Sequence, residues 1–152
     1  MVRRDGFIIL YIHTVNNRNQ RCWLTRLRIS AHNLNIERGR YTQPITPIQN
    51  RICQFCDKSC VDDEVHFLLH CETFDIKRQC LFGKMSSCRN DFLALSESKK
   101  VATLLCPSNA VMAKLVNKYI SIMTAARSRL EKGGTLDLRS FADFSNDDDK
   151  DD

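Results

Sequence analysis

The sequence predicts a small, mainly α-helical domain built around one zinc site, with a disordered acidic tail at its C-terminal end. Gly and Pro are scarce, at 5 and 3 of 152 residues, which favours helices with few breaks over a turn-rich all-β fold. Apolar residues recur at helical spacing, most clearly after residue 109. Eight cysteines are a high count, and four of them lie with two histidines between residues 53 and 71.

Two helices are expected from apolar spacing and end signals. Residues 20–34 form the first, and we interpret its apolar stripe as core packing. Residues 97–105 form the second, because Ser96 suits an N-cap and Pro107 closes the segment. The stripe of the first helix consists of Trp23, Leu24, Leu27 and Leu34.

The strongest helical pattern covers residues 109–131, and Gly133-Gly134 is expected to end that helix. We interpret its stripe as core as well. Residues 35–52 are expected to be a loop, because they contain one glycine and two prolines. The stripe of the last helix consists of Met112, Leu115, Val116, Tyr119, Ile122, Met123, Ala126 and Leu130.

Three parts follow along the chain. Residues 20–131 are expected to form the zinc-binding helical domain. Residues 1–19 are an atypical N-terminal segment, in which residues 7–15 fit either a short buried strand or the end of a hydrophobic segment. Residues 132–152 are expected to be a disordered acidic tail, because charge dominates their composition.

The net charge of +5 hides an asymmetry. Residues 141–152 hold six Asp and one Lys, so they carry −5, and the other 140 residues carry +10. The first 51 residues hold nine Arg against Asp5 and Glu37, which gives +7. A basic body suggests an anionic partner, with RNA or DNA first and an anionic membrane surface second. The same residues also fit a solvated basic face without a dedicated partner.

Cysteine usage depends on the compartment. The short apolar run near the start is followed by no small-x-small cleavage site, so we expect a reducing intracellular setting, in the nucleus or cytoplasm. No apolar run is long enough to span a bilayer, and no membrane partner is expected. In a reducing setting, clustered cysteines indicate metal ligands.

The cluster has the spacing C-x2-C-x9-H-x4-C, formed by Cys53, Cys56, His66 and Cys71. The first pair needs a tight turn that aims two thiolates at one ion. The second pair comes from the end of a helix, where residues four or five apart reach inward together if the last turn relaxes. Four such ligands satisfy tetrahedral Zn²⁺ in a closed, structural site with no position for a catalytic water.

Two further residues compete for this site. Cys60 lies close to Cys56, and His70 lies four residues after His66, so either one can replace a ligand. The cysteines also fit unliganded core residues. Asp62 is expected to cap the helix that carries the second ligand pair, because Asp suits an N-cap position.

The residues around this cluster resemble the zinc-binding region at the C-terminal end of non-LTR retrotransposon reverse transcriptases. The resemblance rests on the run 24–41, on Arg51-Ile-Cys53-x2-Cys56 and on Asp63-Glu64-x-His66-Phe-Leu-Leu-x-Cys71, with a later match at 115–120. It implies that the four positions are zinc ligands and that the module follows a polymerase domain. The implied partners are the template RNA or DNA and the remainder of a reverse transcriptase.

The chain departs from that family in its catalytic residues. Asp62-Asp63 follows Val61 inside the zinc segment and is not the aromatic-x-Asp-Asp turn of a polymerase, and no endonuclease set is evident. A thiol nucleophile would need a base and an oxyanion site, whereas the histidines beside Cys71 are better explained as zinc ligands. We therefore expect a non-enzymatic fragment of a larger protein.

Two functions follow from these observations. The first is a nucleic-acid-binding accessory module, in which basic side chains contact phosphates and Tyr41 or Phe55 stacks on a base. The alternative is an architectural or protein-interaction zinc domain that binds no nucleic acid. The phosphate contacts expected for the first function are Arg26, Arg28, Arg38, Arg40, Arg51 and Lys58.

Overall fold

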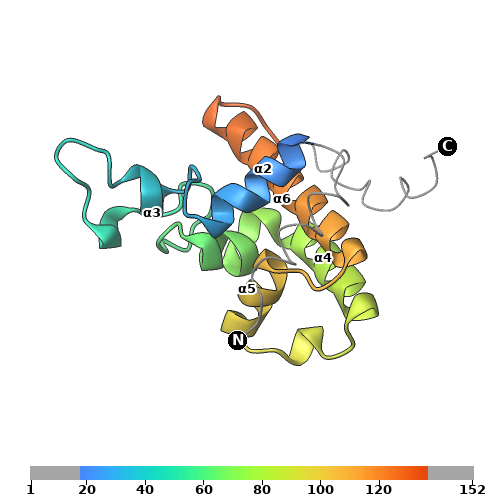
Figure 1. The fold of residues 1–152 in the computed structure, drawn as a ribbon. Coiled ribbons are helices and arrows are strands. Elements are labelled where there is room, and N and C mark those ends of the chain that lie inside the picture. Colours follow the sequence, from blue (N-terminus) through green and yellow to red (C-terminus); the bar gives the residue numbers. More distant parts are fainter. Residues whose placement is uncertain (1–17, 137–152) are drawn as a thin grey trace.

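The computed structural model describes residues 18–136, and helices account for most of them (Figure 1). Within this range no strand is present, and one antiparallel bridge joins Ile52 to Val61. The mainly helical fold class is therefore confirmed. The longer helices are α2 (Arg18–Arg28), α4 (Asp75–Cys88), α5 (Glu97–Leu105) and α6 (Ala110–Glu131). The short helical turns are α3 (Asn35–Arg38), η1 (Ile48–Asn50), η2 (His66–His70), η3 (Glu72–Phe74) and η4 (Phe92–Ala94).

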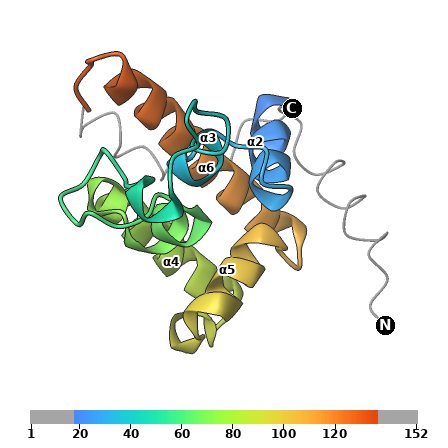
Figure 2. The same cartoon turned by 90° about the vertical axis from the view of Figure 1, so that its left-hand side faces the viewer.

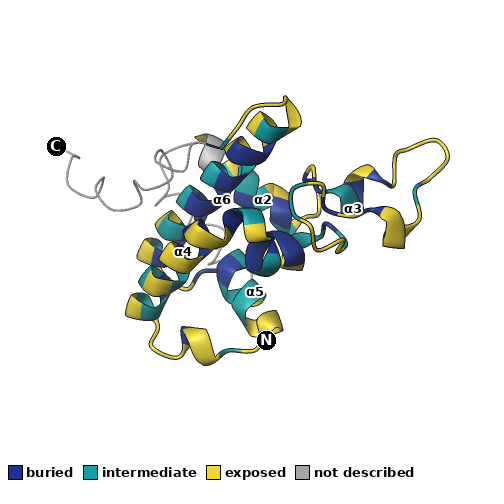
Figure 3. Ribbon diagram, turned by 180° about the vertical axis from the view of Figure 1, so that it is seen from behind, coloured by how far each residue is buried: buried dark blue, intermediate teal, exposed yellow. Residues whose placement is uncertain are grey.

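Helix α6 is the centre of the fold, because α2, α4 and α5 all pack against it (Figures 1 and 2). It starts where the sequence predicts, since the Asn109 side chain accepts a hydrogen bond from the Met112 amide at 2.9 Å. In Figure 3 buried, intermediate and exposed residues alternate along α6, as expected for a helix that packs on one side. The buried apolar residues of α6 are Met112, Ala113, Val116, Tyr119, Ile120, Met123 and Ala126.

Helix α2 is shorter than the predicted helix over 20–34 and ends at Arg28. Ser30 adopts a left-handed φ of 53°, and the Ala31 amide donates to the Arg26 carbonyl at 2.8 Å. These contacts form a Schellman cap, which usually contains glycine at the left-handed position. Ser30 occupies this position here, and a serine does not indicate a helix end in the sequence. The predicted helix therefore extended beyond the observed end at Arg28.

The predicted loop over 35–52 contains two short helical turns, α3 and η1, with an arm of residues 39–50 that projects from the helical body (Figure 1). Most of the arm is exposed (Figure 3). At its base, Gly39 lies so close to Arg51 that an added Cβ would lie 2.5 Å from the arginine Nε. A side chain at position 39 would therefore collide with Arg51.

No helix between residues 18 and 136 is long and apolar enough to cross a membrane. The predicted atypical segment 1–19, with its apolar stretch 7–15, and the predicted acidic tail 132–152 lie almost wholly outside the described residues.

Candidate metal centre

The first two cysteines lie in a short hairpin. The Cys53 amide donates to the Cys60 carbonyl at 2.8 Å, and the Asp62 amide donates to the Arg51 carbonyl at 2.9 Å. Ser59 takes a left-handed φ of 50°, which lets the chain reverse within few residues. The hairpin thereby holds the Cys53 and Cys56 thiols on one side, as the C-x2-C spacing predicts.

The second ligand pair lies at the two ends of a π-helical turn, η2. The Cys71 amide donates to the His66 carbonyl at 2.8 Å, which is the i to i+5 bonding of a π-helix rather than that of an α-helix. This is the relaxed turn that the five-residue spacing requires. The cap is Asp63, whose carboxylate accepts the His66 amide at 2.8 Å, so the predicted cap at Asp62 was one residue off.

The four side chains meet around one point. Their ligand atoms all lie within 4.8 Å of one another, with Cys53 Sγ 3.9 Å from Cys71 Sγ and Cys56 Sγ 3.4 Å from His66 Nε2. A tetrahedral zinc ion with bonds of about 2.3 Å to sulfur and about 2.0 Å to nitrogen separates two sulfurs by about 3.8 Å and a sulfur from a nitrogen by about 3.5 Å. The spacing therefore fits a metal ion.

Electrostatics inside the cluster favour a cation. A hydrogen bond from the Cys71 thiol, together with the His66 ring and the Phe55 amide, holds the pKa of Cys53 well below its ordinary value despite burial. The same bond to Cys53, together with burial, raises the pKa of Cys71. Metal ligation requires thiolates, so a bound cation would favour the deprotonated form of both cysteines.

The His66 ring is oriented without help from its second nitrogen. Nε2 faces Cys56, whereas Nδ1 is buried and has no hydrogen-bond partner among residues 18–136. Metal-bound histidines usually donate this second N–H to a carboxylate or carbonyl. Here the ring is held by the backbone of the π-turn and by packing, since His66 is buried.

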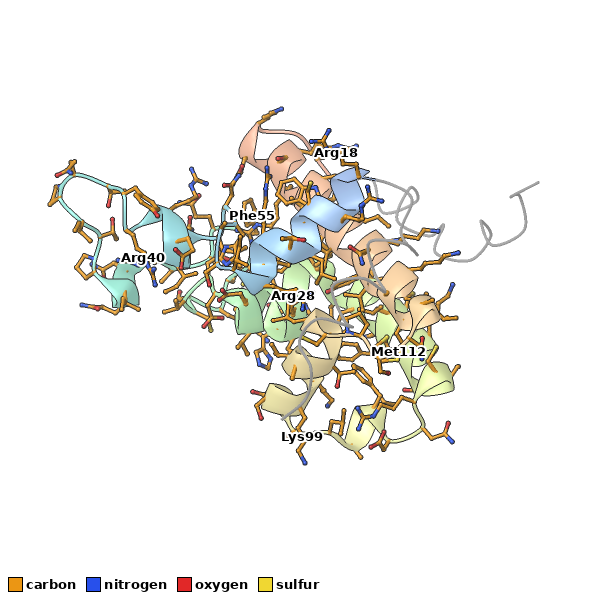
Figure 4. The ribbon with its side chains drawn as sticks, in the orientation of Figure 1. Arg18, Arg28, Arg40, Phe55, Lys99 and Met112 are labelled. Atoms are coloured by element: carbon orange, nitrogen blue, oxygen red, sulfur yellow. The ribbon has the colours of Figure 1, made fainter. Side chains whose placement is uncertain are left out.

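Buried charges fasten the cluster to the helices. Arg78 of α4 donates to the Cys71 and Leu68 carbonyls, the latter at 3.2 Å. Arg127 of α6 makes a bidentate ion pair with Asp62, at 2.6 and 3.0 Å, and its guanidinium lies 4.4 Å from the centre of the Phe55 ring. Figure 4 shows Phe55 between the arm and the helical body.

The two competing ligands lie outside the cluster. Cys60 is exposed, and its thiol donates to the Lys58 carbonyl at 3.3 Å. His70 is partly exposed, with Nε2 3.2 Å from a carboxylate oxygen of Glu97. The other cysteines, Cys22, Cys80, Cys88 and Cys106, are free thiols at exposed or half-buried positions.

The predicted phosphate contacts are dispersed over the molecule. On α2, Arg26 lies over the Trp23 ring at 4.9 Å, and Arg28 lies 3.8 Å from Cys106 Sγ. Figure 4 shows Arg28 on the helical body and Arg40 at the arm, well apart.

Three other basic residues pair with carboxylates around the metal centre and the arm. Arg38 lies 3.0 Å from Glu131, Arg40 lies 3.4 Å from Glu37, and Lys58 lies 3.2 Å from Glu72.

Arg51 differs from the other predicted contacts, because its side chain is 7% exposed. Its Nε donates to the Thr46 carbonyl at 2.8 Å, and Nη1 donates to the Ile36 carbonyl at 2.6 Å. Arg51 therefore joins the arm to α3, whether or not it also contacts a phosphate group.

Sequence reasoning missed Arg78 and Arg127, the two buried cations beside the cluster. Arg127 follows Met123 by four residues and so lies on the buried side of α6, which was the available signal. For Arg78 no comparable pattern exists in the sequence.

Searches for known relatives gave no support for an identity: no family model, no curated protein and no solved structure matches this chain. The resemblance to retrotransposon reverse transcriptases therefore stays a prediction.

Proposed function

We propose that the cluster holds a structural Zn²⁺ ion. Three thiols and one imidazole are a donor set that zinc takes in structural sites, and their separations fit tetrahedral bonding. All four positions belong to the protein, so a bound ion has no open position for water or substrate. The ion would fix the hairpin against the π-turn, and we infer no catalytic role for it.

We propose further that the chain is a nucleic-acid-binding accessory module. One observation carries this proposal: the arm beside the metal centre exposes Arg40 and Tyr41 at its base, next to Arg38 of α3, and Tyr41 is 83% exposed. An exposed aromatic ring that follows two arginines closely in the chain suits stacking on a base with phosphate contacts nearby. The described residues contain 19 Lys and Arg against 10 Asp and Glu, which adds a general attraction for polyanions.

The ion pair of Arg38 is no obstacle to binding. Both of its side chains are exposed, Arg38 by 55% and Glu131 by 36%, and such pairs contribute only ~0–1 kcal/mol. Glu37 is buried, so Arg40 is expected to keep its pair with Glu37 and to contact a phosphate through the exposed part of its guanidinium.

A salt titration tests this proposal. Binding of a labelled single-stranded RNA and its DNA equivalent would be followed by fluorescence anisotropy at increasing salt. Wild type should bind with a steep dependence on salt, and Arg38→Ala with Arg40→Ala should reduce the slope by about one for each lost contact. Arg89→Ala is the matched control, because Arg89 is an exposed arginine paired with Asp91 in the turn after α4. Absence of binding, or a slope that is the same in all variants, would refute the proposal.

The resemblance gives this proposal a setting: a module that follows a polymerase and contacts its template. The remainder of a reverse transcriptase would then be a second partner. Both statements rest on the resemblance and on no contact in the structure.

A second candidate function rests on the same arm. Ile45 and Ile48 are 63% and 59% exposed, which favours a protein-interaction or architectural zinc domain. Changing both to Ser separates the two functions. Nucleic-acid binding through Arg38, Arg40 and Tyr41 should change by less than about twofold, as expected for surface substitutions. If wild type binds neither RNA nor DNA at low salt, the second function replaces the first.

A further inference from the structure

A polar recess lies at the base of the arm, between α3 and the start of the hairpin. Its volume is about 250 Å³, below the range of about 300–1,000 Å³ typical of drug-sized ligands. It therefore suits a small group rather than a large organic molecule. The polar side chains that line it come from Asn35, Arg38, Thr42, Thr46, Asn50, Arg51 and Gln54.

The charge of the recess is positive. Two of its lining residues are arginines and none is an aspartate or glutamate. Two carboxylates contact lining residues: Glu131 lies 3.0 Å from Nη1 of Arg38 in an exposed ion pair, and the buried Asp62, which is paired with Arg127, accepts the Asn35 backbone amide at 2.9 Å.

The Asn35 side-chain amide and the Thr42 hydroxyl already donate to the Ile52 and Gly39 carbonyls. The Asn50 and Gln54 side-chain amides therefore supply the neutral donors for an oxyanion in the recess.

Arg51 is held in place for such a ligand before the ligand arrives. Two of its three guanidinium nitrogens are fixed by the Thr46 and Ile36 carbonyls, and Gly39 leaves the space that its stem occupies. Among the residues that the structure describes, Nη2 has no hydrogen-bond partner and keeps contact with solvent, although Arg51 as a whole is only 7% exposed. An anion in the recess could accept a hydrogen bond from Nη2 without the entropic cost of ordering the side chain, because the other two nitrogens already hold it in place.

We propose that this recess binds a phosphate group of a bound nucleic-acid strand, with Arg51 and Arg38 as its cationic contacts. The proposal rests on the nucleic-acid-binding function given above and deepens it, because it assigns one phosphate to a built position. A free phosphate ion has the same chemistry, so the experiment separates the two sources.

The test replaces amides by carboxylates of the same shape. Asn50→Asp and Gln54→Glu each place a negative charge at the recess, at exposed positions whose side chains make no assigned hydrogen bond. Asn90→Asp is the control, since it makes the same change of charge at an exposed position in the turn after α4. Binding of a labelled single-stranded RNA to the zinc-loaded chain should weaken by roughly tenfold in each recess variant and stay unchanged in the control.

Inorganic phosphate provides the second measurement. In NMR spectra of the wild-type chain, added phosphate should shift the side-chain amide signals of Asn35, Asn50 and Gln54. A chloride salt at the same ionic strength should leave these signals in place. Phosphate at the same concentration should also compete with the RNA.

Each outcome decides one of the two proposals. If wild type binds RNA and the recess variants bind as tightly as Asn90→Asp, the recess proposal is overturned and the nucleic-acid function stands. If wild type binds no RNA but phosphate shifts the three amides, the recess is a site for free phosphate and the strand as its source is overturned. If wild type neither binds RNA nor responds to phosphate, both proposals fail.

Discussion

Two regions of this molecule are stabilised by different forces. The metal segment, residues 51–71, buries polar and ligand side chains, including Arg51, Cys53, Asp62 and His66. Its buried apolar residues come from one turn, 67–69. The helical core of α2, α4, α5 and α6 instead buries mainly apolar side chains, and the turn 67–69 of the metal segment packs into the same cluster.

The difference indicates how each region should respond to change. Apolar contacts are many, small and non-directional, so a core of this kind loses stability gradually as side chains are altered. Ligand bonds and buried ion pairs are few and directional, and losing one partner leaves the other without compensation. We therefore expect the metal segment to fail at single substitutions that the helical core would tolerate.

The largest effect is expected from removing a metal ligand. Cys53→Ser removes one of the four ligands and should abolish metal binding. The effect on stability should be large, because structural zinc contributes about 10–16 kcal/mol of apparent binding energy that is coupled to folding. Native mass spectrometry would count the ions, and hydrogen exchange would locate the damage. Protection should be lost across residues 51–71 and should persist in the middle of α6.

Cys60→Ser is the matched control for the ligand variant. Cys60 lies in the same hairpin but outside the cluster, so this change should leave one metal ion bound. Loss of the ion in both variants would mean that the ligand set has been misassigned. Loss of protection in α6 together with the metal segment would show one cooperative unit and remove the distinction between the two regions.

The next largest effect concerns the ion pair that joins the regions. Arg127→Met should destabilise the chain by ~3–5 kcal/mol, because it leaves Asp62 buried and unpaired. Arg89→Met removes the partner of an exposed carboxylate and should cost less than about 1 kcal/mol. Urea unfolding of the zinc-loaded chains measures both values. Equal losses would contradict the idea that burial of the pair fastens the metal segment to α6.

The two regions also differed in how far the sequence predicted them. The bounds of α5 and α6 and the four clustered ligands followed from caps, apolar spacing and the C-x2-C-x9-H-x4-C pattern, all of which are local. Arg78 and Arg51 are buried through bonds to backbone carbonyls, which no side-chain pattern encodes. The spacing of Arg127 from Met123 indicated its side of α6, but its partner Asp62 lies 65 residues away in the chain. The early end of α2 was missed for a different reason, since Ser30 occupies a position that usually signals itself by glycine.

A smaller effect separates two glycines. Gly39→Ala would place its Cβ 2.5–2.7 Å from the Arg51 side chain, and overpacking of this kind costs about 1–3 kcal/mol. Gly83→Ala in α4 meets nothing within 4 Å and should stabilise the helix by about 0.4–1 kcal/mol. Thermal unfolding shows whether each substitution raises or lowers the stability of the protein. A stabilising effect at position 39 would show that Arg51 moves aside freely, and that result would also weaken the case for a fixed guanidinium in the recess.

The smallest effect compares two serines with left-handed backbone, Ser30 after α2 and Ser59 in the hairpin, at φ values of 53° and 50°. Replacing either by glycine removes strain of about 1–2 kcal/mol but adds entropy to the unfolded chain, so the net gain should be below about 1 kcal/mol. Ser30→Gly also removes an exposed hydrogen bond from Ser30 Oγ to Glu64 of the metal segment. It should still raise the melting temperature of metal-free and metal-loaded protein alike, because the helical core is expected to be folded in both. Ser59→Gly should raise only that of the metal-loaded protein and should tighten metal binding by a few-fold, since the hairpin is expected to form only with the ion. A gain from Ser59→Gly in metal-free protein would mean that the hairpin is already folded without metal, and the metal segment would then be held by Asp62, Arg127 and Arg78 rather than by its ligands.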